Sequence, residues 1–304
     1  MKILVTGGAG FIGSQIVDKL VELGNYVVII DNLSTGKKEN LNKKAKFYKA
    51  DICSEKIFEI FKKENFDVVI HQAAQTSVIC SEKNPEFDAK VNVLGTINLL
   101  ECCRKFSVEK FLYASSAAIY GNPKYFPIDE AHPKEPISVY GMNKYVAELY
   151  LKFYNSIYGI RYISLRYSNV YGPRQNYENE SGVVTIFLNK LINGEKPTIY
   201  GNGSQTRDFI YIDDVVNANI LAIGKKISGE FNISTNKETS IIALYKKIQK
   251  ILGIDISPKY AKGRNVEIFR SVLDNRKAIK ELGWKPKISI EEGLRRTIGY
   301  MKKC

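Results

Sequence analysis

The sequence predicts an α/β fold in which a doubly wound parallel sheet is followed by a smaller C-terminal region. Short β-rich segments alternate with helical patterns over the first half of the 304 residues. A glycine-rich turn joins the first strand directly to the first helix. After about residue 170 the alternation gives way to shorter elements separated by proline and glycine. We therefore place the approximate domains at 1–170 and 171–304, with one or two returns of the chain to the first domain.

The expected strands are short and rich in β-branched and aromatic residues. They are Ile3–Thr6, Val27–Ile30, Phe47–Lys49, Val68–His71, Phe111–Ser115 and Arg161–Tyr167. Helical patterns connect or follow these strands at Gly13–Leu23, Asn84–Lys105, Val183–Leu191, Asp214–Ile223 and Ile241–Leu252. A further long helix follows Ser138, a favoured N-cap residue. In that helix a buried face is predicted from apolar residues at helical spacing, namely Val146, Leu149, Tyr150, Phe153 and Ile157.

Composition limits the class of protein. Hydrophobic residues make up 44% of the chain and charged residues 25%, as in globular proteins. No stretch approaches the roughly 18 apolar residues of a membrane span, and the apolar run before Gly7 is too short for a signal peptide. The five cysteines show no Cys-x-x-Cys spacing, and adjacent Cys102 and Cys103 are expected in a core or an interface. These observations favour a cytoplasmic protein.

Two other kinds of ligand are not expected. The chain has only two histidines and no cluster of histidine and cysteine, so no metal site is predicted. The net charge of +13 suggests nucleic acid, but the basic residues are spread as doublets such as Lys62-Lys63 and form no single stripe with aromatics. Solvated helix faces explain these doublets better. We therefore expect no nucleic-acid partner and no membrane partner.

The turn after the first strand has the spacing Gly7-x-x-Gly10-x-x-Gly13. Glycines at this spacing permit a tight turn and let the backbone approach a pyrophosphate at the helix N-terminus. Asp31 ends the second expected strand, where a carboxylate binds ribose hydroxyls and repels a 2′-phosphate. The sequence thus predicts a Rossmann-type site for NAD rather than NADP. Asp51 has two interpretations, a contact to the adenine or an N-cap of the next helix.

A possible proton-transfer pair lies in the long helix. Tyr140 and Lys144 are four residues apart, so they share one helix face. A tyrosine hydroxyl titrates near ~10 and is a poor base at neutral pH, but a neighbouring ammonium favours the phenolate. Ser116, at the end of the fifth expected strand, can hydrogen-bond the same substrate hydroxyl. These three residues are the predicted catalytic group for oxidation of an alcohol by NAD.

Taken together, the motifs resemble the extended short-chain dehydrogenase/reductase family, and within it the UDP-glucose 4-epimerases, over nearly the whole chain. The segments that carry the resemblance are Gly7–Ser14 (GGAGFIGS), Asp31–Gly36 (DNLSTG), His71–Gln75 (HQAAQ), Val91–Asn98 (VNVLGTIN), Ser115–Gly121 (SSAAIYG), Tyr140–Lys144, Leu165–Gly172 (LRYSNVYG) and Gln205–Asp214 (QTRDFIYIDD). The resemblance implies NAD as cofactor, a UDP-sugar as substrate and a homodimer packed through the helices near 85–105 and 139–158.

The resemblance also implies the residues of each site. The residues implied to bind NAD are Gly7, Gly10, Phe11, Ile12, Gly13, Asp31, Asn32, Leu33, Ser34, Thr35, Gly36, Asp51, Ile52, Ala73, Ala74, Gln75, Asn92, Tyr140, Lys144 and Tyr167. Those on the substrate side are Ser116, Tyr140, Asn169, Val183, Thr198, Ile199, Tyr200, Arg207, Arg264 and Glu267. Arg207 and Arg264 are expected on the diphosphate, which suits a pair of arginines, and Glu267 on the uridine ribose.

The implied reaction is NAD-dependent epimerisation of a UDP-hexose at the sugar 4-position through a transient 4-keto sugar, as in galactose metabolism. Ala117 and Ala118 follow Ser116 where dehydratases and decarboxylases of the family place an acid or base, so those reactions are disfavoured. The alternatives are a UDP-glucuronate 4-epimerase, a 4-ketosugar reductase or a non-enzymatic NAD-sensing protein.

Three positions depart from the family pattern. Arg264-Asn265-Val266-Glu267 replaces the usual Arg-Pro-Gly-Asp/Glu, and Asn143 replaces a serine or threonine. Ser271 stands where some members carry a bulky residue that is associated with exclusion of N-acetylated sugars. A small side chain there leaves room for UDP-N-acetylglucosamine as well as UDP-glucose.

Overall fold

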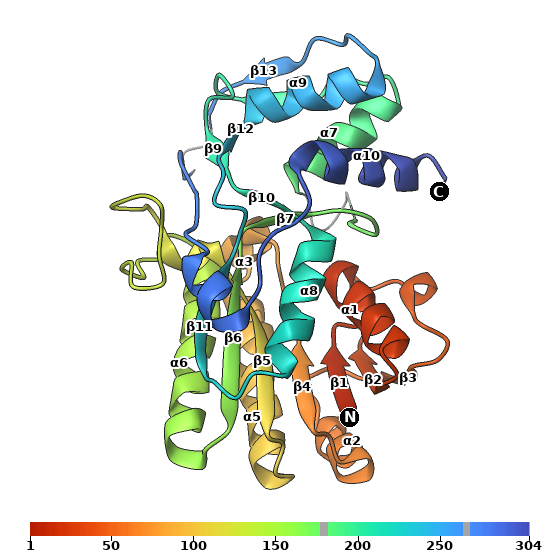
Figure 1. Cartoon of the computed structure of the whole chain (residues 1–304), viewed down its shortest axis with the longest axis vertical. Coiled ribbons are helices and arrows are strands. Elements are labelled where there is room, and N and C mark those ends of the chain that lie inside the picture. Colours follow the sequence, from red (N-terminus) through yellow and green to blue (C-terminus); the bar gives the residue numbers. More distant parts are fainter. Residues whose placement is uncertain (177–181, 264–267, 304) are drawn as a thin grey trace.

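The computed structural model describes residues 1–176, 182–263 and 268–303. The central sheet contains β1 (Lys2–Thr6), β2 (Tyr26–Asp31), β3 (Lys46–Lys49), β4 (Val68–His71), β5 (Lys110–Ser116), β6 (Arg161–Tyr167) and β11 (Gly229–Ile233). Its strand order is β11-β6-β5-β4-β1-β2-β3, and all neighbouring pairs are parallel. The order reverses between β1 and β4, where such sheets form a crevice for ligands. Helices on both faces (Figure 1) confirm the predicted Rossmann-type fold.

The strands are apolar on both faces because helices cover both. In β1 the side chains of Ile3 and Val5 point to one face and that of Leu4 to the other, and all three are fully buried. The register places Val5 beside Ile29 of β2 and Ile70 of β4. Branched side chains packed on a two-sided sheet explain why these short runs form strands. All six strands expected from the sequence are confirmed.

Two helices cover one face of the sheet and three cover the other. α1 (Phe11–Glu22) and α8 (Ile212–Ile223) contact each other and pack on the face of Val5. α2 (Lys56–Glu64), α5 (Gly95–Lys105) and α6 (Val139–Tyr158) pack on the opposite face. α6 begins after Ser138, whose hydroxyl accepts the N–H of Gly141 at 3.1 Å. The predicted N-cap is therefore confirmed.

The helix predicted at Asn84–Lys105 is interrupted. It consists of α4 (Pro85–Ala89), the π-helical segment η2 (Lys90–Leu94) and α5, and α3 (Val78–Lys83) precedes it. A wide turn of this kind is frequent at functional sites. Here it contains Asn92, whose buried amide bonds both backbone groups of Gln75, at 2.9 and 3.1 Å. The irregular turn thus fixes a predicted cofactor residue.

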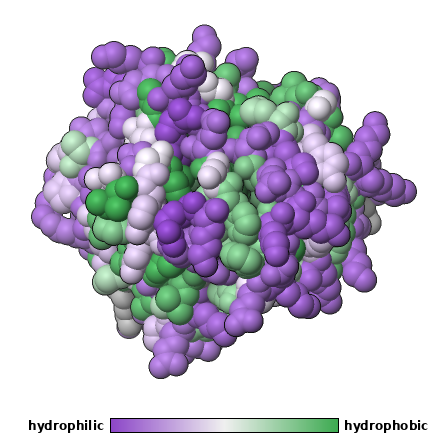
Figure 2. Space-filling model, turned by 90° about the horizontal axis from the view of Figure 1, so that it is seen from below, coloured by the Kyte–Doolittle hydropathy of each residue, from purple (hydrophilic) through white to green (hydrophobic). Residues whose placement is uncertain are grey.

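The buried face predicted for α6 is wrong. Leu149, Phe153 and Ile157 are 45%, 51% and 59% exposed, Tyr150 is also exposed and Val146 is half-buried. The buried side of the helix consists of Gly141, Asn143, Lys144, Ala147, Glu148, Leu151 and Tyr154. The polar members of this side find partners inside the protein, so the apolar stripe is left outside. Seen from below, hydrophobic areas lie between polar side chains on the face where the helices end (Figure 2).

The second half adds smaller elements beyond the carboxyl end of the sheet (Figure 1). Its helices are α7 (Val183–Ile192), α9 (Ile241–Leu252) and α10 (Ile290–Met301). Its strand pairs are β7 (Asn169–Tyr171) with β10 (Phe209–Tyr211), β9 (Thr206–Arg207) with β12 (Thr239–Ser240), and β8 (Thr198–Tyr200) with β13 (Lys259–Ala261). After residue 170, β11 joins the main sheet and α8 packs on it. The division near residue 170 stays a prediction. No helix within the described ranges is long and apolar enough to cross a membrane.

Candidate active site

The glycine turn forms a cradle that a side chain would fill. Gly7 has φ +68°, and a Cβ there would lie 2.6 Å from the backbone nitrogen of Ala73. A Cβ on Gly13 would lie 2.2 Å from the carbonyl oxygen of Gly7. α1 then begins at Phe11 without a side-chain cap, so its first N–H groups, including that of Ile12, face the turn. These free donors and the positive helix end fit the pyrophosphate of a dinucleotide.

Asp31 braces this turn from the end of β2. It is 7% exposed, and its carboxylate accepts the N–H of Ala9 at 3.0 Å and that of Leu33 at 2.8 Å. The sequence predicts Asp31 only as a ribose ligand. The structure shows in addition that the carboxylate holds the glycine turn against the loop Asn32–Gly36.

Asp51 lies beside that loop. It accepts the Nδ2 hydrogen of Asn32 at 3.0 Å and the N–H of Cys53 at 2.8 Å. Partial burial opposes ionisation, but these hydrogen bonds outweigh it and keep the pKa of Asp51 below its usual value. The N-cap residue of α2 is Glu55, so the alternative interpretation of Asp51 as that cap is wrong.

A second loop, after β4, supplies Ala73, Ala74 and Gln75. The N–H of Ala73 donates to the hydroxyl of Thr6 at 3.3 Å, so the loop is joined to the end of β1. Gln75 is fixed by Asn92 of η2, as described above. The two predicted cofactor loops therefore meet at the crevice where the strand order reverses.

Tyr167, at the end of β6, is held by two amides that the sequence did not indicate. Its hydroxyl accepts hydrogen bonds from Gln72 Nε2 at 3.1 Å and from Asn219 Nδ2 of α8 at 2.8 Å. Burial raises the pKa of Tyr167 to about 12, so this phenol stays protonated at neutral pH. Gln72 lies in the HQAAQ segment, but Asn219 is distant in sequence and no local pattern marks it.

In the proposed proton-transfer pair, Lys144 lies on the buried side of α6 and Tyr140 is half-buried in its first turn. Lys144 is 3% exposed, and its ammonium donates to the carbonyl of Ala114 at 2.9 Å and lies 5.8 Å from the ring centre of Tyr140. Burial lowers the pKa of Lys144 to about 8, although the carboxylates of Asp88 and Glu148 oppose this. The ammonium is thus desolvated beside the phenol whose ionisation it would favour.

Ser116 ends β5 next to the first turn of α6. Its hydroxyl accepts the N–H of Ala118 at 3.1 Å and caps the short helix η3 (Ala117–Tyr120). A Cβ on Gly141 would lie 2.5 Å from the carbonyl oxygen of Ala118, so η3 and α6 are in close contact. This contact brings the elements of Ser116, Tyr140 and Lys144 together.

Apart from Ser116 and Tyr140, the predicted substrate residues lie from Asn169 onward. Asn169 is exposed on β7, Val183 begins α7, and half-buried Arg207 lies on β9, where it pairs with Thr239 of β12. In β8 the side chain of Ile199 is 1% exposed and belongs to the core, whereas Thr198 and Tyr200 are more accessible. Arg264 and Glu267 lie outside the described residues.

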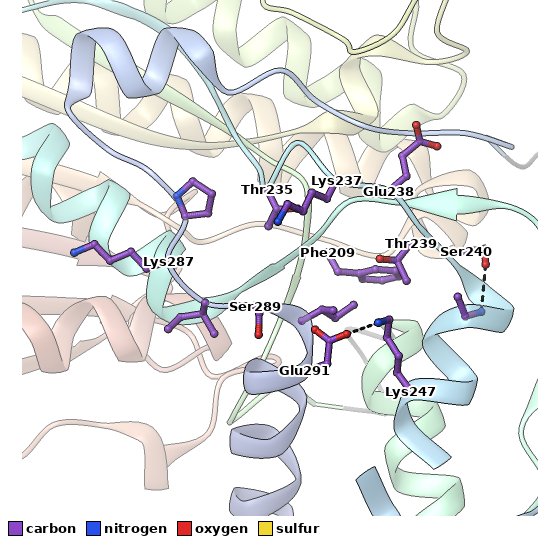
Figure 3. Close-up of a pocket in the computed structure, with 14 residues that line it drawn as sticks. Phe209, Thr235, Lys237, Glu238, Thr239, Ser240, Lys247, Lys287, Ser289 and Glu291 are labelled. Atoms are coloured by element: carbon purple, nitrogen blue, oxygen red, sulfur yellow. Dashed lines mark hydrogen bonds and ion pairs between the residues drawn. The ribbon is translucent and has the colours of Figure 1, made fainter. Parts of the chain in front are cut away.

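A cavity of about 630 Å³ lies between β10, α9 and α10 (Figure 3). An ion pair between Lys247 and Glu291 spans it, and Ser240 and Ser289, the N-caps of the two helices, line it. None of the predicted site residues is among the side chains that form this cavity. In the described part of the chain, no group of three or more metal-binding side chains is present.

Comparison with known proteins places the chain in a family. Residues 3–234 match the model of the NAD dependent epimerase/dehydratase family. A Methanocaldococcus jannaschii protein whose name gives UDP-glucose 4-epimerase as a provisional assignment is 50% identical over 301 residues, which are 99% of this chain and 98% of that protein. The chain therefore belongs to the NAD-dependent epimerase/dehydratase family, and the predicted cofactor, NAD, is confirmed.

Solved structures agree with this placement. The UDP-glucose 4-epimerase of Thermotoga maritima, solved with UDP-glucose, superposes with a TM-score of 0.98 at 48% identity and covers 100% of this chain and 99% of its own. The UDP-N-acetylglucosamine 4-epimerase of Methanobrevibacter ruminantium, in complex with UDP-N-acetylmuramic acid, has a TM-score of 0.95 at 37% identity, covering 99% and 98%. The predicted enzyme class, an isomerase resembling UDP-glucose 4-epimerases, is confirmed.

Proposed function

We propose that this enzyme interconverts UDP-hexoses at position 4 of the sugar, and that Tyr140 is the group that exchanges the proton. The observation that supports this most directly is the buried ammonium of Lys144 at 5.8 Å from the Tyr140 ring. Both residues stand beside the end of β5, at the carboxyl edge of the sheet where ligands of this fold bind.

In the proposed reaction, Tyr140 removes the proton of the sugar 4-hydroxyl and Ser116 hydrogen-bonds the same oxygen. NAD, which the residues of the glycine turn and Asp31 would hold, would supply the hydride acceptor for sugar C4 and the hydride donor that restores it. Lys144 stabilises the phenolate of Tyr140, because a cation in a water-poor site lowers the cost of the neighbouring negative charge. The residues of the glycine turn hold the cofactor while the 4-keto sugar rotates to present its opposite face.

The surroundings of Ser116 favour epimerisation over related reactions. Ala117 and Ala118 are half-buried in η3 and carry no group that could protonate a leaving hydroxyl or assist the loss of carbon dioxide. An epimerase needs only the proton exchange and the reversible oxidation. A 4-ketosugar reductase would use the same residues but would consume reduced cofactor stoichiometrically.

The sugar pair is proposed to include N-acetylated hexoses. Ser271 is half-buried and follows Arg270. The backbone of Arg270 forms a β-bridge with Thr206, the neighbour of Arg207 in β9. A small residue thus adjoins the strand proposed to contact the diphosphate. We propose that this space admits the N-acetyl group, so that both UDP-glucose and UDP-N-acetylglucosamine are substrates.

The proposed assembly is a homodimer packed through α6 and the helical segment near 85–105. The support for it is the exposed stripe of Leu149, Phe153 and Ile157 on α6, with Phe87 and Leu94 exposed at 46% and 58% on the neighbouring segment. A second copy of this chain would remove this apolar surface from water.

A cytoplasmic location is also proposed. Cys53, Cys80, Cys102 and Cys103 carry free thiols, and burial raises the pKa of Cys103 well above its usual value. Buried protonated thiols of this kind need no oxidising compartment.

The test is incubation of the purified enzyme, supplied with NAD, with UDP-glucose and separately with UDP-N-acetylglucosamine, followed by chromatographic separation of the products. We expect UDP-galactose and UDP-N-acetylgalactosamine, respectively, without net change in reduced cofactor. Stoichiometric consumption of reduced cofactor would instead identify a reductase. If neither sugar is interconverted, the proposed substrates are wrong.

A further inference from the structure

A buried carboxylate joins the cofactor loop to the helix of Tyr140 and Lys144. Asp88 of α4 is 0% exposed. One of its oxygens accepts a hydrogen bond from Gln75 Nε2 at 2.6 Å, and the other accepts one from Asn143 Nδ2 at 2.7 Å. Both oxygens of this buried acid are thus bonded to uncharged amides.

The two amides belong to the two halves of the candidate site. Gln75 lies in the loop predicted to contact NAD, and its Oε1 also accepts the N–H of Ser77 at 2.6 Å, which fixes the orientation of its amide. Asn143 directly precedes Lys144 on the buried side of α6 and is 8% exposed. Asp88 therefore sets the distance between the loop and the helix turn that carries Lys144.

The segment around Asp88 also supports the first turn of α6. The N–H of Tyr140 donates to the hydroxyl of Ser81, and that of Val139 donates to Glu82 Oε1, both at 3.1 Å. The first N–H groups of a helix have no partner within it. Side chains of α3 satisfy them here, so the start of α6 is held by the same segment that supplies Asp88.

Asp88 also acts on the charge of Lys144. The ionisable groups about Lys144 are Asp88 of α4, Glu148 and Tyr140 of α6, His71 of β4 and Tyr113 of β5. Burial, helped by Lys144, lowers the pKa of His71 to about 3, so His71 is neutral. Glu148 is paired with the buried guanidinium of Arg166 at 2.7 Å. The side-chain hydrogen bonds to Asp88 among the described residues come from neutral amides, and its negative charge favours the ammonium of Lys144.

We propose that Asp88 is a positioning residue for proton transfer, which holds α6 against the cofactor loop and keeps Lys144 in its ammonium form beside Tyr140. This inference rests on the proposed roles of Tyr140 and Lys144. Asn143, which replaces the serine or threonine usual in the family, supplies the amide that makes the contact in this chain.

The first test is Asp88→Asn in the NAD-loaded enzyme with UDP-glucose. The substitution keeps the shape of the side chain, removes its charge and leaves an amide facing the amides of Gln75 and Asn143. We expect kcat to fall about 10- to 100-fold, with KM changed by less than about threefold. The pH–rate profile should move to lower pH, because loss of a nearby negative charge lets the ammonium of Lys144 deprotonate more readily. NAD binding, measured by calorimetry, should weaken about 3- to 10-fold.

The second test exchanges the two groups. Combining Asp88→Asn with Asn143→Asp restores one carboxylate and one amide donor at the same contact. We expect kcat to return to within about fivefold of wild type and the pH–rate profile to return as well. Glu86→Gln, at an exposed acid of the same helix, is the matched control and should change neither.

An unchanged kcat and pH–rate profile in Asp88→Asn would overturn the proposal. The proposal would also be overturned if the double exchange failed to restore kcat although the cofactor-free forms of both variants still unfold cooperatively. If Asp88→Asn does not fold, Asn143→Ala decides, because alanine has no donor for the carboxylate. A lower kcat without a shifted profile is expected, and full activity would refute the contact. If Tyr140→Phe keeps its turnover, the proposed catalytic pair fails, independently of Asp88.

Discussion

The ammonium of Lys144 lies 5.8 Å from the ring centre of Tyr140 and donates its hydrogen bond to the backbone of Ala114 rather than to a carboxylate. Because no counter-ion takes up this hydrogen bond, the charge remains available to the phenol one helical turn away. The arrangement supports the proposal that Tyr140, whose residue type is ordinarily a weak base, exchanges the proton of the sugar.

Burial of this ammonium makes stability depend on pH. The pKa of Lys144 is lowered from 10.5 to about 8, so between these values the unfolded chain binds more protons than the folded one. The loss of folded-state stability caused by the buried charge is fully present below about pH 8, and it disappears as the pH rises towards 10.5. We expect wild type to gain roughly 1–3 kcal/mol relative to Lys144→Met between about pH 7.5 and 10, measured by urea unfolding. A constant difference would contradict the burial of a charged lysine.

The glycine cradle predicts the effect of one methyl group. Gly13→Ala places a Cβ 2.2 Å from the carbonyl oxygen of Gly7. The turn must deform, and we expect NAD affinity measured by calorimetry to fall by about 100-fold or more. Gly299→Ala in α10, where a Cβ meets nothing within 4 Å, is the control and should bind NAD normally. Normal binding by the Gly13 variant would argue against this turn as the pyrophosphate site.

Ser271 predicts which sugars are accepted. Ser271→Tyr should lower kcat/KM for UDP-N-acetylglucosamine about 100-fold and leave that for UDP-glucose within about threefold, because only the larger sugar needs the space. Initial rates with each sugar measure this. Equal losses for both sugars would show that position 271 does not select between them.

The exposed stripe of α6 predicts self-association. Phe153→Glu puts a charge in the centre of the proposed dimer interface and should weaken dimerisation about 30-fold or more in sedimentation analysis. Ile279→Glu, which changes a residue 44% exposed on η4 (Ala278–Leu282), should leave the oligomeric state unchanged. A wild-type chain that sediments as a monomer would refute the proposed homodimer.

Local patterns in the sequence predict much of this molecule. The strands, the Ser138 cap and the glycine turn follow from residue types and short spacings, and so does the shared face of Tyr140 and Lys144. Each depends on groups within about one helical turn of one another. This is why Tyr140 and Lys144 could be proposed as a catalytic pair before the fold was known.

Features that depend on distant partners could not be predicted in this way. The apolar stripe of α6 suggested a buried face, yet the polar stripe with Lys144 is inside because its partners come from other elements. Asp88 meets Asn143 across 55 positions of sequence, and Asn219 meets Tyr167 across 52. Such contacts are set by the packing of helices on the sheet, and no local spacing in one sequence reveals them.

The central claim is that the phenol of Tyr140 exchanges the proton of the sugar. Its most direct test is the rate of UDP-glucose interconversion by Tyr140→Phe, with bound NAD measured in the same sample. We predict a loss of about 1000-fold or more with NAD still bound, since only the hydroxyl is removed. A variant that turns over at the wild-type rate would contradict the account.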